Sequence, residues 1–179
     1  KLKIIQATHT AELAIRFGRK AKNVIDSKEY QELFKTKLQE DSKAAGRWET
    51  KQGGEYFAAG VGGAITGRGA DLLIIDDPHS EQDAMSKDLL EKAYEWYTSG
   101  ARQRLQPGGK IVVVMTRWST KDLTAKLIAS QTEAKADQWH VVEFPAIMDN
   151  KPVWPEYWSS AELEKVKAVL PNAKWNAQW

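Results

Sequence analysis

Two adjacent carboxylates close a short apolar run near the middle of the chain. The apolar residues Leu72 to Ile75 are followed directly by Asp76, Asp77 and Pro78. An unbroken apolar run is typical of a strand covered on both faces, as in a parallel sheet between helices, and ligands gather at the carboxyl ends of such strands. Two like charges beside an apolar wall are costly unless a cation compensates them, so we expect Asp76 to hold a hydrated Mg²⁺. An acidic turn that caps a following helix would account for the same residues.

A second pair of reactive side chains follows a second apolar run. Residues Lys110 to Met115 are largely β-branched and predict a buried strand, after which come Thr116 and Arg117. Nucleotide hydrolysis needs a metal-binding acid, an acid that orients water, and a hydroxyl and a guanidinium that sense charge on the γ-phosphate. All these residue types follow neighbouring predicted strands. We therefore expect the acid pair and the Thr116–Arg117 pair to share one crevice.

A glycine-rich segment precedes the acidic strand. Five glycines lie between residues 60 and 69, a composition that suits close approach of the backbone to a ligand. The segment matches neither of the common phosphate-binding patterns and precedes a strand rather than a helix, so we expect a loop beside the site. Arg68, between two of these glycines, either reaches a phosphate in its own or a neighbouring subunit or forms an ion pair with a nearby acid.

The remaining pattern predicts strands that alternate with helices. Further strands are expected at residues 3–7, 55–60 and 139–144, helices at 11–25, 83–101 and after a cap at Ser119 or Thr120, a turn at 107–109, and an irregular excursion at 35–54. This alternation predicts an α/β fold with a mostly parallel sheet flanked by helices and joined by right-handed crossovers.

The C-terminal part of the sequence differs in character. Residues 153–158 are rich in tryptophan and form either a docking surface or a loop that packs on its own domain. Ser159 and Glu162 form a capping box that predicts a helix to about Leu170, and Pro171 can open another. We expect residues 1–150 to form the main core and residues 151–179 a tryptophan-rich helical extension.

Composition excludes several classes of protein. The 179 residues include no cysteine and three histidines, which excludes disulfides and thiolate metal sites and argues against a zinc centre. The chain has neither an apolar run of membrane-spanning length nor a signal-peptide pattern, so we expect a cytosolic protein without membrane contact. The formal net charge of +2 is too small to indicate nucleic-acid binding by itself, so any DNA contact would have to come from a local patch or from parts outside this chain.

The motifs gain specificity when they are taken together. The segments Ile65–Pro78 and Met115–Ser119, with Trp96, residues 102–105 and Asp122–Leu123, resemble the ATPase domain of the large terminase subunit of tailed bacteriophages. The resemblance extends to residues 7–10 near the start and 175–178 at the end. It implies a P-loop NTPase core of the ASCE type with ATP and Mg²⁺ as cofactors.

The resemblance also implies roles for individual residues. Asp76 matches the Walker B magnesium ligand. The next position is usually the catalytic glutamate but here is Asp77, which leaves water activation to either Asp77 or Glu81. Thr116 and Arg117 match the coupling motif, which senses the state of ATP and transmits it to the DNA-moving parts, and both are expected to contact the cofactor.

The implied whole protein is a DNA-packaging motor. It would form a homo-oligomeric ring in the host cytoplasm, dock transiently on the procapsid, and drive double-stranded DNA inward, with the portal protein and the small terminase subunit as partners. The family's Walker A loop is expected before Lys1 and its nuclease domain after Trp179, so the chain is expected to be the interior of a longer protein and inactive alone. Two other functions remain open: a helicase-like ATPase that depends on nucleic acid, and a catalytically dead fragment that acts as an interaction module.

Overall fold

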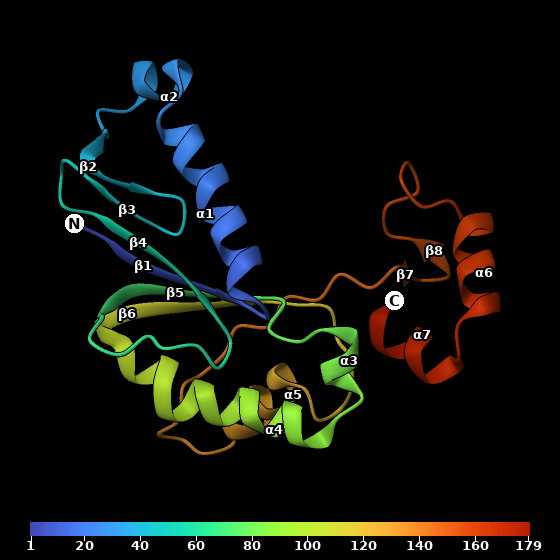
Figure 1. The fold of residues 1–179 in the computed structure, drawn as a ribbon. Coiled ribbons are helices and arrows are strands. Elements are labelled where there is room, and N and C mark those ends of the chain that lie inside the picture. The colour runs from blue at the N-terminus through green and yellow to red at the C-terminus, as the bar shows by residue number, and fades with distance from the viewer. The chain divides into compact units, whose positions relative to one another are not determined.

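The computed structural model describes residues 1–179, apart from the side chain of Lys43. The chain divides into two compact units, Lys1–Met115 and Thr116–Trp179, which we call unit 1 and unit 2. Unit 1 contains a six-stranded sheet with the order β2-β3-β4-β1-β5-β6 (Figure 1). The predicted α/β fold, with a mostly parallel sheet flanked by helices, is confirmed. The division of the sequence at residue 150 stays a prediction.

Four parallel strands form the larger part of the sheet. They are β4 (Glu55–Gly60), β1 (Lys3–Thr8), β5 (Ala70–Asp76) and β6 (Leu105–Val114), and β1 lies between β4 and β5. Helix α1 (Ala11–Ile25) follows β1 and α4 (Lys87–Glu95) follows β5, and the two helices lie on opposite sides of the sheet (Figure 1). The strands expected at residues 3–7, 55–60 and 72–75 are confirmed with small changes at their ends.

The expected irregular excursion at residues 35–54 is wrong. It contains β2 (Leu38–Ala44) and β3 (Arg47–Thr50), an antiparallel pair that extends the sheet beyond β4. This segment is polar in composition, but two of its side chains, Leu38 and Trp48, are buried in the core. The Trp48 ring stacks on Tyr56 of β4 with centroids 4.9 Å apart, and this packing holds the hairpin against the parallel strands.

Helix α1 forms where the periodicity predicts it. Thr10 caps it by accepting a hydrogen bond from the backbone N–H of Leu13 at 3.3 Å. Gly18 lies on the buried face, where an added Cβ would come within 2.6 Å of the Tyr56 ring and of the Ala45 carbonyl oxygen. The indole N–H of Trp48 donates to the Gly18 carbonyl at 3.1 Å. The missing side chain at Gly18 therefore lets α1 dock closely on the sheet. After it, Ser27 caps the short helix α2 (Lys28–Leu33).

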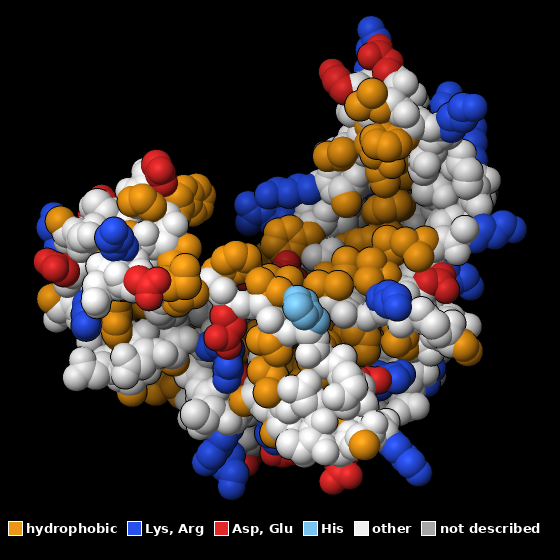
Figure 2. All heavy atoms as spheres, turned by 180° about the vertical axis from the view of Figure 1, so that it is seen from behind, with side chains coloured by type: hydrophobic (Ala, Val, Ile, Leu, Met, Phe, Trp, Pro, Cys, Tyr) orange, Lys and Arg blue, Asp and Glu red, His pale blue; other side chains and the backbone are white. Residues whose placement is uncertain are grey.

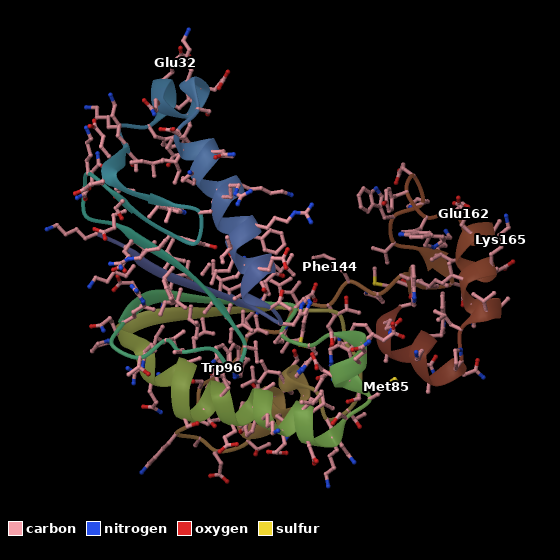
Figure 3. The ribbon with its side chains drawn as sticks, viewed as in Figure 1. Glu32, Met85, Trp96, Phe144, Glu162 and Lys165 are labelled. Carbon is pink, nitrogen blue, oxygen red and sulfur yellow. The ribbon has the colours of Figure 1, made fainter. Side chains whose placement is uncertain are left out.

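The single helix expected at residues 83–101 is divided into several pieces. Ser80 caps α3 (Glu81–Ala84) through a capping box with Asp83, and a second cap at Ser86, which begins α4, interrupts the expected helix. The chain then widens into a π-helical segment, η1 (Trp96–Ala101), and tightens into a 3₁₀ turn, η2 (Arg102–Arg104). The Trp96 indole N–H reaches the Gly63 carbonyl in the glycine-rich loop at 3.4 Å (Figure 3).

Strand β6 differs from the buried strand that the sequence predicts. It is the last strand of the sheet, and it includes the residues expected to form a turn, Pro107 to Gly109, as a bulge between the pairs Ala70–Leu105 and Leu72–Lys110. Val112 and Val114 are 45% and 56% exposed. Its β-branched run therefore lies at a sheet edge rather than between two neighbours.

Most of the regular secondary structure in unit 2 is helical, and the segments between its elements are irregular. Asp122, rather than Ser119 or Thr120, caps α5 (Leu123–Ser130), because its side chain accepts from the Ala125 N–H at 2.9 Å. The capping box of Ser159 and Glu162 is confirmed at the start of α6 (Ser160–Val169), and α7 (Asn172–Gln178) follows Pro171. None of the helices in the described part of the chain has the length and apolarity needed to span a membrane.

The strand expected at residues 139–144 is wrong. These residues are irregular, and Val141, Val142 and Phe144 are exposed (Phe144 is labelled in Figure 3). Within the described residues of unit 2, the only strands are β7 (Ile147–Met148) and β8 (Lys151–Pro152), a two-stranded hairpin. A strand needs a neighbour with which to share its backbone hydrogen bonds, and strand-like composition at 139–144 does not supply one.

Candidate functional site

The parallel strands of unit 1 deliver several polar groups to one edge of the sheet. The register pairs Thr8 with Gly60, Ala7 with Ile75, and Asp76 with Val114, so all four strands end at nearly the same level. The chain leaves β1 toward β4 and leaves β5 toward β6, which makes the gap between β1 and β5 the topological switch point of the sheet. In open α/β sheets this position, at the carboxyl ends of the strands, is where ligands bind.

Asp76 lies at this edge as the last residue of β5, with its side chain partly buried. Burial raises the pKa of its carboxyl group above the ordinary value, and the neighbouring charge of Asp77 raises it further. No hydrogen bond from the described residues reaches the Asp76 carboxylate. A carboxylate with this environment gains from a nearby cation, which fits the expected role as a magnesium ligand.

Asp77 has an exposed side chain on an unusual backbone. Its φ of 44° lies in the left-handed region, which costs roughly 1–2 kcal/mol for a residue other than glycine. Its N–H donates to the Val114 carbonyl at 2.9 Å, and its own carbonyl accepts from the His9 N–H at 3.0 Å. The backbone of Asp77 therefore connects the end of β6 to the turn between β1 and α1, and these bonds hold the strained conformation in place.

The turn between β1 and α1 places two residues, Thr8 and His9, at the same edge. Thr8 is fully buried and donates its hydroxyl proton to the Thr10 carbonyl at 2.6 Å, and its own carbonyl accepts from the Val61 N–H at 2.8 Å. His9 Nδ1 lies 3.3 Å from the Asp77 carbonyl oxygen. The glycine-rich loop therefore begins at the same edge as the acid pair, as expected.

Arg68 lies at the opposite end of the parallel strands, where β4 and β5 begin. Its guanidinium donates to Glu55 Oε1 at 2.8 Å and lies 3.8 Å from the centroid of the Phe57 ring. Glu55 begins β4, and its register places it about five strand residues before the level of Asp76, a distance of roughly 16 Å. Of the two alternatives that the sequence left open, the ion pair with a nearby acid is the one present in this chain.

Glu81, the other candidate for water activation, is the first residue of α3, and its side chain is exposed. Between Asp77 and this helix, Pro78 and His79 are buried. They anchor the segment that joins the acid pair to Glu81.

Unit 2 begins with the predicted coupling residues. Thr116 has an exposed side chain, whereas the Arg117 guanidinium is paired through its Nε with Asp122 Oδ2 at 3.0 Å. The same carboxylate oxygen accepts from the N–H groups of Trp118 at 3.0 Å and Ser119 at 3.2 Å. Arg117 is therefore one of several groups that organise the turn before α5.

Asp122 is fully buried, and its carboxylate accepts four hydrogen bonds. Burial by itself raises the pKa of its carboxyl group. Hydrogen bonds from Ala125, Trp118, Arg117 and Ser119 outweigh that effect, and the pKa lies below the ordinary value. From the sequence, Asp122 was named only within a segment that resembles the terminase family, and its role as the centre of this network was missed.

The predicted site residues are thus distributed over both units. Asp76, Asp77 and Glu81 belong to one segment of unit 1, and Thr116 and Arg117 belong to unit 2. A crevice shared by the two pairs stays a prediction. Among the described side chains, no group of three or more histidine, aspartate or glutamate residues forms a metal site by itself. No family model matches the chain, and no curated protein matches it.

Proposed function

We propose that this chain is part of the ATPase motor of a viral DNA-packaging terminase large subunit, with a P-loop NTPase core of the ASCE type. In this proposal the motor couples ATP hydrolysis to translocation of double-stranded DNA into the procapsid. One observation carries the proposal. Asp76 ends a parallel strand at the switch point of the sheet, the pKa of its carboxyl group is raised, and no described residue donates a hydrogen bond to its carboxylate. The motifs that resemble the terminase family supply the rest of the argument.

Asp76 is the residue that would hold Mg²⁺. Magnesium keeps several waters and is usually bound by one or two carboxylates together with substrate phosphates, so a single partly buried aspartate suits it. When bound, the ion would neutralise charge on the phosphates during hydrolysis. The nearby negative charge of Asp77 favours the same cation.

Asp77 and Glu81 are the candidates for orienting the attacking water. Backbone hydrogen bonds to His9 and Val114 fix Asp77, while its side chain is exposed. Glu81 has the longer side chain and begins a capped helix. The fixed backbone favours Asp77, because a general base must be held within hydrogen-bond reach of the water.

Thr116 and Arg117 would transmit the state of the nucleotide. The hydrogen bond from the Asp77 N–H to the Val114 carbonyl ties the acid segment to β6 two residues before Thr116. The pairing of Arg117 with Asp122 ties the following turn to α5. A displacement of the acid segment would therefore pull on the strand that leads into the coupling residues. We further propose that Arg68 supports the fold of its own subunit through its ion pair with Glu55.

The decisive experiment measures ATP hydrolysis in a polypeptide that carries this chain behind a phosphate-binding loop. Asp76→Asn should reduce turnover to background, because it removes the metal ligand. Asp77→Asn should spare nucleotide binding and slow turnover. If Asp77→Asn turns over normally and Glu81→Gln does not, water activation belongs to Glu81. Normal turnover in Asp76→Asn would refute the proposal.

The biological role needs a separate test. Stimulation of hydrolysis by portal protein and empty procapsids, together with ring assembly and binding of the small terminase subunit, is expected of a packaging motor in the host cytoplasm. Strand separation on a forked duplex without that stimulation would instead identify a helicase-like ATPase.

One observation favours a role as an interaction module. Trp154 and Tyr157 of unit 2 are 60% and 64% exposed, and their rings stack with centroids 4.8 Å apart. Titration of this chain with Mg²⁺ and a nonhydrolysable ATP analogue addresses that role. The longer protein should bind the analogue whereas this chain alone should not, and an absence of binding in both would favour the interaction module.

A further inference from the structure

Helix α1 carries a concentrated positive charge. Its fifteen residues include Arg16, Arg19, Lys20 and Lys22 against a single carboxylate, Glu12, so the helix has a net charge of +3. The whole chain has a net charge of only +2. The charge of the rest of the molecule is therefore slightly negative, and the helix is the local basic patch that the overall composition conceals.

Three of these cations form one stripe along the helix. Arg16, Arg19 and Lys20 are spaced three and four residues apart, which places them on one face at 100° per residue. The buried residues Ala14 and Gly18 lie on the opposite face, against the sheet. All three cationic side chains are exposed, and none forms an ion pair or hydrogen bond with another described residue. In Figure 2, blue side chains project from the part of unit 1 that α1 occupies.

The stripe is held on a rigid support. The close approach at Gly18 and the hydrogen bond from Trp48 to its carbonyl fix α1 on the sheet. A cationic face on a docked helix loses little freedom when it binds a partner, unlike a charged tail. The packed apolar face of α1 also argues against a membrane as the partner, since an interfacial helix needs that face to enter the lipid.

We propose that Arg16, Arg19 and Lys20 form a surface that contacts the phosphate backbone of duplex DNA. Two of the three are arginines, whose planar fork matches phosphate oxygens, and contacts between cations and phosphates do not depend on the base sequence. The choice of duplex DNA rests on the proposed function, whereas the positions of the three cations do not depend on it.

The test is DNA binding by the chain as it stands, measured by fluorescence anisotropy with a labelled 25-base-pair duplex. The wild type is expected to bind at about 50 mM salt, and its affinity should fall steeply as salt rises. The triple variant Arg16→Gln, Arg19→Gln, Lys20→Gln should lose about tenfold or more in affinity at low salt. Its slope of log K against log salt should decrease by roughly 2 to 3.

A matched control separates the stripe from total charge. Lys87→Gln, Lys92→Gln, Lys165→Gln removes three exposed cations elsewhere and should bind nearly as the wild type does. The charge-preserving variant Arg16→Lys, Arg19→Lys should keep most of the salt dependence. Circular dichroism and thermal melting are expected to be unchanged in all variants, because every substituted side chain is exposed.

Three outcomes would contradict the proposed DNA-binding surface. The first is an absence of DNA binding by the wild type at low salt, and the second is an equal loss of DNA affinity in the triple variant and the control. The third is sedimentation with phosphatidylserine vesicles without DNA binding. The ATPase test through Asp76→Asn is separate, because that substitution should leave DNA affinity intact. DNA binding without hydrolysis in the longer protein would support the DNA-binding surface and contradict the proposed ATPase motor. Hydrolysis without DNA binding by α1 would support the motor and contradict the surface.

Discussion

Asp76 in unit 1 and Asp122 in unit 2 are two carboxylates removed at least partly from solvent, and their pKa values are shifted in opposite directions. Asp122 is fully buried and accepts hydrogen bonds from one guanidinium and three backbone N–H groups, and its pKa is lowered. Asp76 is less buried, but its pKa is raised because no donor compensates its burial and Asp77 repels its charge. The comparison shows that hydrogen-bond donors, rather than the extent of burial, decide whether the charged form of a buried acid is stabilised.

The difference also separates two roles. An acid with every lone pair satisfied has no capacity left for a ligand and serves the fold. An acid that is uncompensated costs stability and gains from a cation, which is the usual situation at a functional site. Unit 2 is therefore expected to lose stability when its acid is removed, and unit 1 is expected to lose function.

The largest effect is expected from Asp122→Ala. It removes a buried acceptor and leaves the Arg117 guanidinium and three N–H groups without it, so unfolding of unit 2 should become easier by about 3–5 kcal/mol. Urea denaturation followed by tryptophan fluorescence measures this. Glu164→Gln, an exposed acid on α6, is the control and should change little. A stability equal to that of the wild type would contradict the structural role of Asp122.

A smaller loss is expected from Arg117→Met. This change removes the charged hydrogen bond to Asp122 and the longer one to the Ser119 carbonyl, but it leaves the backbone donors to Asp122, so it should cost about 1.5–3 kcal/mol. The same denaturation experiment applies, and Arg117→Lys should recover part of the loss. If Arg117→Met were as damaging as Asp122→Ala, the backbone donors would contribute nothing and the network would be wrongly described.

The ionisation of Asp122 should make the stability of unit 2 depend on pH. Its pKa is lower in the folded than in the unfolded state, so its stabilising contribution is complete above the unfolded value of about 3.9. That contribution should disappear as pH falls through the lower, folded value. Denaturation midpoints between pH 6 and pH 2.5, compared with those of Asp122→Asn, measure it. The difference between the two proteins should shrink below about pH 4, and a constant difference would contradict the prediction.

The smallest effect, of opposite sign, is expected from Asp76→Asn. The pKa of Asp76 is raised in the folded state, so its ionisation at neutral pH opposes folding. Its neutral substitute should stabilise unit 1 by about 0.5 kcal/mol at pH 7, and the gain should vanish below about pH 4, where both states are protonated. Thermal melting measures this, with Asp41→Asn as an exposed control. Destabilisation by Asp76→Asn would place Asp76 in the same class as Asp122.

Local patterns predicted much of unit 1. The apolar period of α1, the cap at Thr10 and the run before Asp76 are properties of a few neighbouring residues, and each element formed where it was expected. The level of Asp76 followed from the rule that parallel strands end together.

The errors arose where a remote partner decides the structure. Residues 35–54 form a hairpin because Trp48 finds Tyr56, and residues 139–144 lack a strand neighbour. The choice of Asp122 over Ser119 as the cap depends on Arg117, Trp118 and Ala125 converging on one carboxylate. The left-handed backbone of Asp77 likewise follows from hydrogen bonds to the end of β6 and to the turn between β1 and α1, which no short sequence pattern encodes.

The position of β6 at the end of the sheet has a practical consequence. A strand with one unpartnered side offers its amides and carbonyls to any extended peptide, and proteins usually defend such strands with proline, lysine or a bulge. Here Pro107, the bulge and Lys110 defend the first half of β6, whereas Ile111 to Val114 are undefended. At high concentration, molecules of this chain are therefore expected to associate by pairing a strand of one copy with that four-residue stretch of another.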